Sequence, residues 1–144
     1  MFENFNLYGT MPVYTEIVNH IQFAVASGRL KEGERLPSVR ALGKMLQIHF
    51  ALAAIAYRDL EIMGLVDTRH GMGTFVAEDA GVKCREKCRR RFIERLHEVV
   101  AEAKAAGMTQ QEIKAICAAS YAAECDPYVE VPDSLLALVN GKGN

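Results

Sequence analysis

The chain has 144 residues, of which half are apolar and about a quarter are charged, as in ordinary globular proteins. Its formal net charge of −1 gives no whole-chain signature of nucleic-acid binding. No apolar run approaches the roughly 18 residues of a membrane span, and the first residues lack the basic and apolar regions of a secretory signal. We therefore expect a cytoplasmic protein with no membrane partner, whose four cysteines are free thiols.

A first amphipathic helix is predicted from Pro12 onward. Proline suits the first turn of a helix, and the apolar residues that follow recur at helical spacing until Gly28, which can end the helix. A polar loop comes next, and Ser38 stands where the cap of a second helix is expected. That second helix carries one apolar stripe, consisting of Val39, Leu42 and Leu46.

A turn around residues 47–49 leads into a third helix that is expected to end near Gly64. Two strand-like runs follow, and Gly71 and Gly73 between them predict a hairpin turn. Two helices, a turn, a third helix and a β-hairpin are the elements of a winged helix-turn-helix, in that order. We therefore expect a mainly α-helical fold with a small β-hairpin, and we place a winged helix-turn-helix domain at residues 1–78.

The composition changes around residues 79–81, where a strongly helical segment begins. Gly107 is expected to end this helix, and Thr109 and Glu112 have the spacing of a capping box that starts another. Residues 79–144 are therefore predicted to form an α-helical hairpin that serves as a dimerisation tail.

This tail is too small to bury much core alone, so it must pack either on the first domain or on another subunit. Asp126-Pro127 is expected to stop its second helix, and at most one short turn of helix should follow. A homodimer would cover an apolar stripe on the two helices, formed by Phe92, Leu96, Val99, Ile113 and Ile116.

Short motifs between residues 10 and 78 carry a resemblance to a known family. They are, in chain order, Gly-Arg-Leu, Leu-Pro-Ser-Val-Arg, Ala-Tyr-Arg-Asp-Leu-Glu, Gly-Leu-Val and Arg-His-Gly-Met-Gly-Thr-Phe-Val. Together these motifs resemble the GntR family of bacterial transcriptional regulators, although any one alone would be weak evidence. The short two-helix tail is similar to that of the YtrA subfamily, which lacks larger effector-binding domains and uses the tail mainly to dimerise.

The resemblance implies roles for particular residues. Ser38 and Arg40 would contact phosphate, and the loop around Arg69 matches the wing, whose tip enters or borders the minor groove. Tyr57 and Leu60 would pack the third helix on the core. The candidate DNA-binding residues are Ser38, Arg40, His49, Phe50, Ala51, Tyr57, Arg58, Arg69, His70, Gly71, Gly73 and Thr74.

The third helix departs from the family pattern at its start. Relatives usually place small polar or basic residues there. This chain has Leu52 where they have a Thr that donates a hydrogen bond to phosphate, and Ala54 where they often have Arg or Lys. Helical spacing leaves Ala51, Ile55 and Arg58 to face a DNA groove. The opposite, core-facing side is expected to consist of Ala53, Ala56, Tyr57 and Leu60.

Such an apolar face supports two interpretations. Base edges are recognised by forked donors and acceptors, and the thymine methyl group is the only apolar feature among them. Either the helix still enters the major groove and recognises DNA with shallow specificity, or a partner covers it and the chain is a protein-interaction module with a GntR-like frame.

Cys84 and Cys88 lie four residues apart and therefore on one face of the predicted helix. A metal site completed by Cys117, Cys125 or His97 is one interpretation, but no Cys-x-x-Cys motif occurs, and unligated thiols are favoured. Exposed thiols beside basic residues would have lowered pKa values, which would suit redox sensing.

The basic run around these cysteines is typical of a solvated helix face. It could also supply the nonspecific attraction to DNA that residues 1–79 lack, because they contain seven basic and nine acidic side chains. The run consists of Lys83, Arg85, Lys87, Arg89, Arg90 and Arg91.

No nucleophile elbow, phosphate-binding glycine loop or carboxylate pair with a nearby histidine occurs in the sequence, so we expect no enzyme and no cofactor or metal. The sequence instead predicts a transcriptional regulator that binds double-stranded DNA. As a homodimer on a two-fold operator, it would act as a repressor. The sequence identifies neither the operator nor a small-molecule effector.

Overall fold

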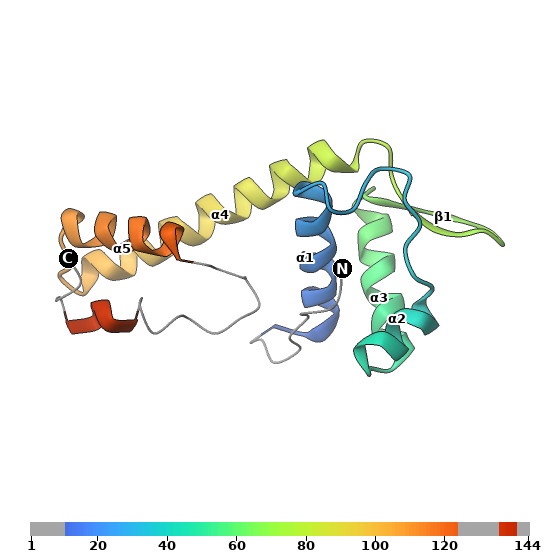
Figure 1. Cartoon of the computed structure of the whole chain (residues 1–144), viewed down its shortest axis with the longest axis horizontal. Coiled ribbons are helices and arrows are strands. Elements are labelled where there is room, and N and C mark those ends of the chain that lie inside the picture. The colour runs from blue at the N-terminus through green and yellow to red at the C-terminus, as the bar shows by residue number, and fades with distance from the viewer. Residues whose placement is uncertain (1–10, 124–135, 141–144) are drawn as a thin grey trace. The chain divides into compact units, whose positions relative to one another are not determined.

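The computed structural model describes residues 11–123 and 136–140 of the chain. They belong to two compact units, of which the first ends at Arg91 and the second begins at Phe92. The domain boundary expected after residue 78 concerns which segments fold and function independently. It stays a prediction. The first unit contains α1 (Val13–Ala26), α2 (Val39–Leu46), α3 (Phe50–Ile62), β1 (Val66–Arg69), β2 (Gly73–Val76) and the beginning of α4 (Ala80–Ala105), as Figure 1 shows.

The local sequence explains where the first two helices begin and end. Pro12 occupies the N-cap of α1, and the left-handed Gly28, with φ of 78°, follows its last turn. Ser38 caps α2 as predicted, because its hydroxyl accepts a hydrogen bond from the Ala41 N–H at 3.1 Å.

The turn between α2 and α3 is tight. Gln47 ends α2 in the left-handed conformation, with φ of 55° and ψ of 42°. Gly43 lies against the turn, where an added Cβ would stand 3.1 Å from the Ile48 carbonyl oxygen and 3.1 Å from the Phe50 Cα. The missing side chain at Gly43 therefore lets the end of α2 approach the start of α3 closely.

α3 packs against both α1 and α2 and forms the centre of the first unit. Its inward face is the predicted one, with Ala53, Ala56 and Leu60 fully buried and Tyr57 only 6% exposed. The large, fully buried apolar side chains of this core are Ile17, Ile21, Leu42, Leu60, Leu65, Val66 and Val76.

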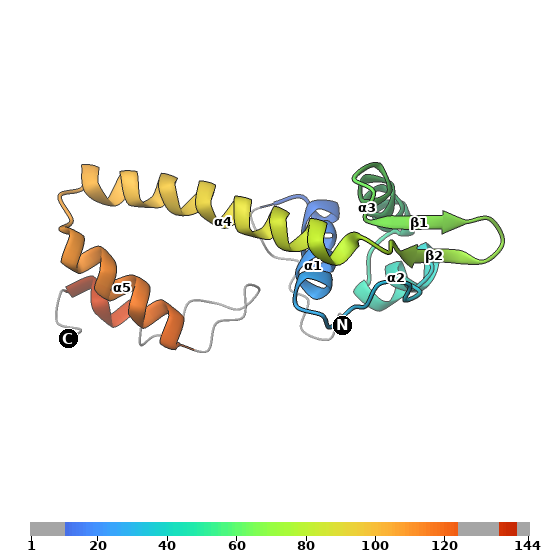
Figure 2. The same ribbon diagram turned by 90° about the horizontal axis from the view of Figure 1, so that it is seen from above.

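β1 and β2 form the predicted antiparallel hairpin, with Val66 paired to Val76 at its base. The hairpin turn projects away from the helices of the first unit (Figure 2). The loop before α2 pairs with β2 as well: the Leu36 N–H donates to the Thr74 carbonyl at 2.8 Å, and the Val76 N–H donates to the Glu34 carbonyl at 2.9 Å. The base of the hairpin is thus held on both sides.

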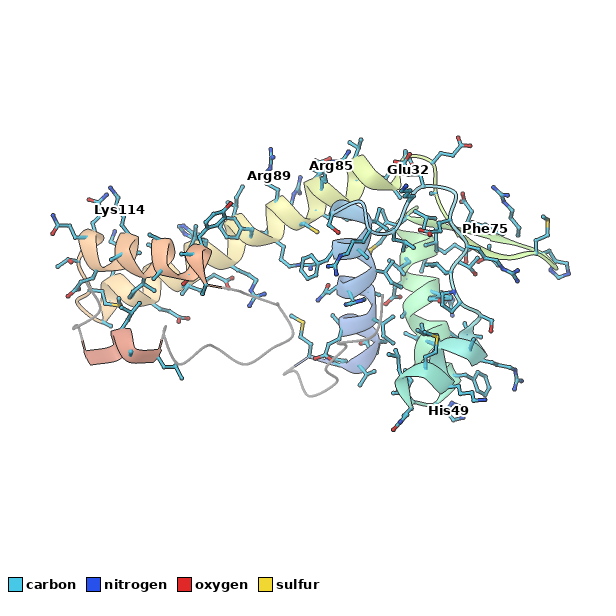
Figure 3. All side chains as sticks on the ribbon, in the orientation of Figure 1. Glu32, His49, Phe75, Arg85, Arg89 and Lys114 are labelled. Carbon is cyan, nitrogen blue, oxygen red and sulfur yellow. The ribbon has the colours of Figure 1, made fainter. Side chains whose placement is uncertain are left out.

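Polar contacts join the beginning of α4 to the rest of the first unit. The Glu32 carboxylate, which lies beside the start of α4 (Figure 3), accepts a hydrogen bond from the Gly81 N–H at 3.0 Å. Three turns later, the Arg91 guanidinium donates to the side-chain oxygen of the buried Gln22 at 2.7 Å and lies over the Phe23 ring. These contacts explain why the compact unit extends into α4.

The second unit contains the rest of α4, α5 (Gln110–Ala122) and a short 3₁₀ turn, η1 (Ala137–Asn140). Gly107 follows the end of α4 with φ of 84°, as predicted. The predicted capping box is present: the Glu112 N–H donates to the Thr109 hydroxyl at 3.2 Å, and the Thr109 N–H donates to the Glu112 carboxylate at 2.8 Å.

η1 is the short turn expected near the carboxyl end, whereas the stop expected at Asp126-Pro127 lies outside the described residues. No helix in the described part of the chain is both long enough and apolar enough to cross a membrane. The predicted fold class, a winged helix-turn-helix followed by helices, is confirmed.

Candidate nucleic-acid interface

The start of α2 presents one cap and one cation. Because the Ser38 hydroxyl already accepts from the Ala41 N–H, its own proton is the group left for an external acceptor. Arg40, two residues further, is exposed, and its guanidinium lies 4.8 Å from the centre of the Phe50 ring. This cation–π contact holds the Arg40 side chain beside the start of α3.

His49 caps α3 and stacks on the residue that follows it. Its Nδ1 accepts a hydrogen bond from the Ala51 N–H at 3.2 Å, so the proton of the neutral ring is assigned to Nε2. The His49 and Phe50 rings stack with centroids 4.7 Å apart. His49 lies at the junction of α2 and α3 (Figure 3). Its side chain is exposed, so the Nε2–H can donate to an external acceptor.

An open cleft of about 250 Å³ lies at this junction. Two cations, an imidazole and the first turn of α3 meet there, and the N-terminus of a helix favours negative charge. The cleft is therefore suited to a phosphate group. Its lining consists of Arg40, Gly43, Lys44, Ile48, His49 and Phe50.

The outward face of α3 is as apolar as predicted. Ile55 is 43% exposed and Ile62 is 75% exposed, although both are large hydrocarbon side chains. Ala51 and Ala54 are exposed as well, and Arg58 is the cation on this side of the helix. No described part of the first unit covers this face, so its apolar side chains are exposed as predicted.

The hairpin carries the wing. The left-handed Gly71, with φ of 74°, belongs to the turn, and His70 beside it is exposed. The Arg69 guanidinium lies 4.7 Å from the centre of the Phe75 ring, which fixes a cation at the edge of the hairpin. Thr74 is half-buried, and its carbonyl oxygen accepts from the loop before α2.

Arg35 is a further cation of the wing that sequence reasoning did not find. It pairs with Phe75 in an isolated antiparallel bridge. An added Cβ on Gly73 would stand 2.8 Å from the Arg35 Nε, so the glycine makes room for this guanidinium. The sequence signal was weak, because Arg35 stands in a polar loop without strand periodicity.

Tyr57 has a different place from the other candidate residues. It is buried, and its hydroxyl donates to the Pro37 carbonyl at 2.6 Å. Burial raises the pKa of this phenol well above its usual range. Tyr57 therefore positions α3 against the loop before α2, and its side chain is not part of the exposed surface.

Charge is distributed unevenly over the first unit. Between Arg35 and Arg58 the sequence contains four Lys and Arg residues and no Asp or Glu. The acids elsewhere are partly engaged: Glu32 binds the start of α4, and Asp79 forms an ion pair with Lys83 at 2.7 Å. The surface made by α2 and the start of α3 is thus cationic although the whole chain is not.

The predicted lowering of the cysteine pKa values is wrong. Cys84 is buried where α4 packs on the first unit, and desolvation raises the pKa of its thiol to about 11, with a further contribution from Cys88 that Lys87 and Arg85 partly offset. Burial also raises the pKa of Cys88. These two thiols are protonated at neutral pH, which does not suit redox sensing.

Within the described residues, no group of three or more His, Cys, Asp or Glu side chains is placed to hold a metal ion. Cys117 is an exposed free thiol on α5, and Cys125 lies outside the described residues.

Helices, cationic surface and wing together define a winged helix-turn-helix DNA-binding protein. The model of the family described as "Bacterial regulatory proteins, gntR family" matches residues 13–76. The chain is 31% identical over 104 residues to the HTH-type transcriptional regulator YhcF of Bacillus subtilis, covering 71% of this chain and 84% of that protein. It is 28% identical over 102 residues to the transcriptional repressor YtrA of the same organism, covering 71% and 78%.

Solved structures agree. A transcriptional regulator from Oenococcus oeni has a TM-score of 0.65 at 29% identity, covering 81% of this chain and 96% of that one. A GntR family regulator from Listeria monocytogenes has a TM-score of 0.62 at 27% identity, covering 74% and 92%. The chain belongs to the GntR family of transcriptional regulators, in its YtrA-like subfamily, and not to a family of enzymes.

Proposed function

We propose that this regulator is a cytoplasmic repressor that binds a two-fold DNA operator as a homodimer. The observation that carries the proposal is the acid-free, cationic surface of α2 and the start of α3, with the wing beside it in the same compact unit. Cations at these positions neutralise backbone phosphates, which provides affinity and fixes the register of the helix in the groove. A regulator that occupies the operator in this way would block transcription of the adjoining gene.

The dimer is supported by the apolar residues of the second unit. Phe92 is 64% exposed, Val99 is 58% exposed, and Leu96 between them is 37% exposed. Their spacing of four and then three residues is typical of a coiled-coil seam. We call these three residues the α4 seam. No residue of α5 is buried either, so a second copy of the chain would cover apolar surface that one copy leaves in water.

A second candidate function is a protein-interaction module. The exposed apolar side chains of α3, chiefly Ile55 and Ile62, favour this function. A helix that binds in the major groove seldom needs such side chains on its outer face. Arg40 and Lys44 at the start of α3, and Arg58 between the two isoleucines, favour DNA as the partner.

The experiment is a selection of bound sequences from random duplex DNA with the full chain, followed by affinity measurements at several salt concentrations. A two-fold consensus is expected. Arg40→Ala and Arg69→Ala should each weaken binding to all sequences and reduce the slope of log affinity against log salt by about 1.8, the value for two lost phosphate contacts, one in each half-site.

Arg29→Ala is the matched control, because Arg29 is an exposed arginine in the loop after α1, outside the proposed interface. It should leave the salt slope unchanged. Equal slopes for the wild type and for Arg40→Ala and Arg69→Ala would contradict the proposed docking.

A further inference from the structure

The outward face of α3 has few groups that can form hydrogen bonds with base edges. Ala51, Ala54 and Ile55 occupy three exposed positions in its first two turns. In the major groove, base edges present acceptors, donors and one hydrocarbon group, the 5-methyl of thymine. Only that methyl group is matched by an alanine or isoleucine side chain.

The rotation of α3 about its axis is fixed, so this face cannot turn away. Ala53, Ala56 and Leu60 are fully buried on the inward side, and the Tyr57 hydroxyl ties the helix to the Pro37 carbonyl at 2.6 Å. The packing of α3 against the core therefore determines that its apolar face points outward.

The spacing along the helix also suits DNA. Ala51 and Ile55 are four residues apart on one face, which corresponds to about 6 Å of helix rise. Two base-pair steps of B-DNA span a similar length, about 7 Å. The two side chains can therefore contact methyl groups on base pairs that lie two steps apart.

Charge indicates which partner covers the face. Arg40 and Lys44 line the cleft at the start of α3, and Arg58 lies further along its exposed side. Ala51 and Ile55 lie near these cations, whereas the acids of α3, Asp59 and Glu61, stand in its last turn. Hydrocarbon beside cations matches a groove whose floor carries methyl groups and whose walls are phosphates. An apolar protein surface would offer these cations no negative charge.

Resting on the proposed function, we infer that α3 recognises the 5-methyl groups of thymine, with Ala51 and Ile55 as the specificity-determining residues. The operator half-site should therefore contain thymines two base-pair steps apart under the start of α3. Cytosine carrying a 5-methyl group presents the same hydrocarbon and should substitute for thymine in part.

The test compares duplexes that differ only in these methyl groups. The selected site is synthesised with deoxyuridine in place of single thymidines, which removes the methyl from the major groove and leaves the minor-groove edge unchanged. One methyl removed under α3 in each half-site is expected to weaken binding roughly 15-fold, that is, about fourfold for each methyl or ~0.8 kcal/mol.

Variants of Ile55 show whether α3 is responsible. At one thymine position in each half-site, Ile55→Ser should bring the affinity ratio of thymidine to deoxyuridine duplexes close to one, whereas Ile55→Val should preserve most of it. The ratio at the thymine contacted by Ala51 should persist in both variants. Because Ile55 is exposed, both variants are expected to fold, and the ratio is independent of the fraction of active protein.

The outcomes are distinct. A defined site bound equally with thymidine and deoxyuridine would overturn the inference while leaving the proposed function intact. If Ile55→Ser also left DNA affinity unchanged, the face would belong to a protein partner. A library that yields no preferred sequence would overturn the proposed sequence-specific function, and the inference with it.

Discussion

At the scale of single residues, Gln47 is under conformational strain. Among the described residues it is the only one other than glycine with a positive φ, 55°. An L-amino acid with a side chain pays about 1–2 kcal/mol in this region, because its Cβ crowds the carbonyl oxygen. The strain lies in the turn that sets the direction of α3, and close packing at Gly43 maintains it.

Gln47→Gly is therefore expected to raise the free energy of unfolding by about 0.5–1 kcal/mol. The gain is smaller than the strain because glycine also makes the unfolded chain more flexible. Urea unfolding at fixed protein concentration measures it. Gln47→Ala keeps the Cβ and should give no gain, so equal stabilisation by both variants would refute the backbone explanation.

Sequence patterns predicted those residues whose role is local. Ser38 is such a residue, because a cap depends only on the following turn. The burial of Cys84 depends on how α4 packs on the first unit, and no local pattern contains that information. Arg35 joins the wing through backbone pairing with Phe75, a contact between segments far apart in sequence. Tyr57 was expected in the core, but its bond to Pro37 could not be foreseen.

At the scale of elements, the phase of α3 and the position of the hairpin followed from periodicity and from turn glycines. The length of α4 that belongs to the first unit could not be predicted in this way. The start of α4 is held by Glu32, which lies in the loop after α1. The first N–H groups of a helix have no partner within the helix, so a carboxylate there stabilises it by a hydrogen bond and by its charge.

Glu32→Ala should lower the free energy of unfolding by about 0.5–2 kcal/mol, the usual cost of a lost cap. Glu32→Gln keeps an acceptor for the Gly81 N–H and loses only the charge, so its loss should be smaller, about 0.3–1 kcal/mol. Urea unfolding monitored by circular dichroism provides the comparison. Glu78→Gln, at an exposed acid with the same charge change, is the control, and a loss there as large as for Glu32→Ala would argue against capping.

At the scale of the whole molecule, the two units divide the work that the proposed function requires. The first unit has a core, a cationic surface and a wing, which is what contact with one half-site needs. The second unit is rich in exposed hydrocarbon, and beyond Cys84 no residue in the described part of α4 or α5 is buried. Exposed hydrocarbon of this extent favours a covering partner, and a second copy would also place two wings on a two-fold site.

If the proposed dimer forms through the α4 seam, Val99→Glu is expected to leave the chain monomeric at micromolar concentration. A carboxylate introduced into the α4 seam must lose water without gaining a partner, which should weaken dimerisation by about 2 kcal/mol or more, a change of roughly 30-fold in the dissociation constant. Ala101→Glu adds the same charge two residues away, on the opposite face of α4, where Ala101 is exposed. It should leave the dimer intact.

Sedimentation equilibrium of the full chain distinguishes these outcomes, and circular dichroism checks that each variant keeps its helices. Val99→Glu should also bind the selected DNA site with lower affinity and without cooperativity between half-sites, because its two wings are no longer held at a fixed spacing. Dissociation by Ala101→Glu as readily as by Val99→Glu would place the interface on another face. A wild-type chain that sediments as a monomer would remove the dimer from the proposed function and leave the second unit to be covered by a different partner.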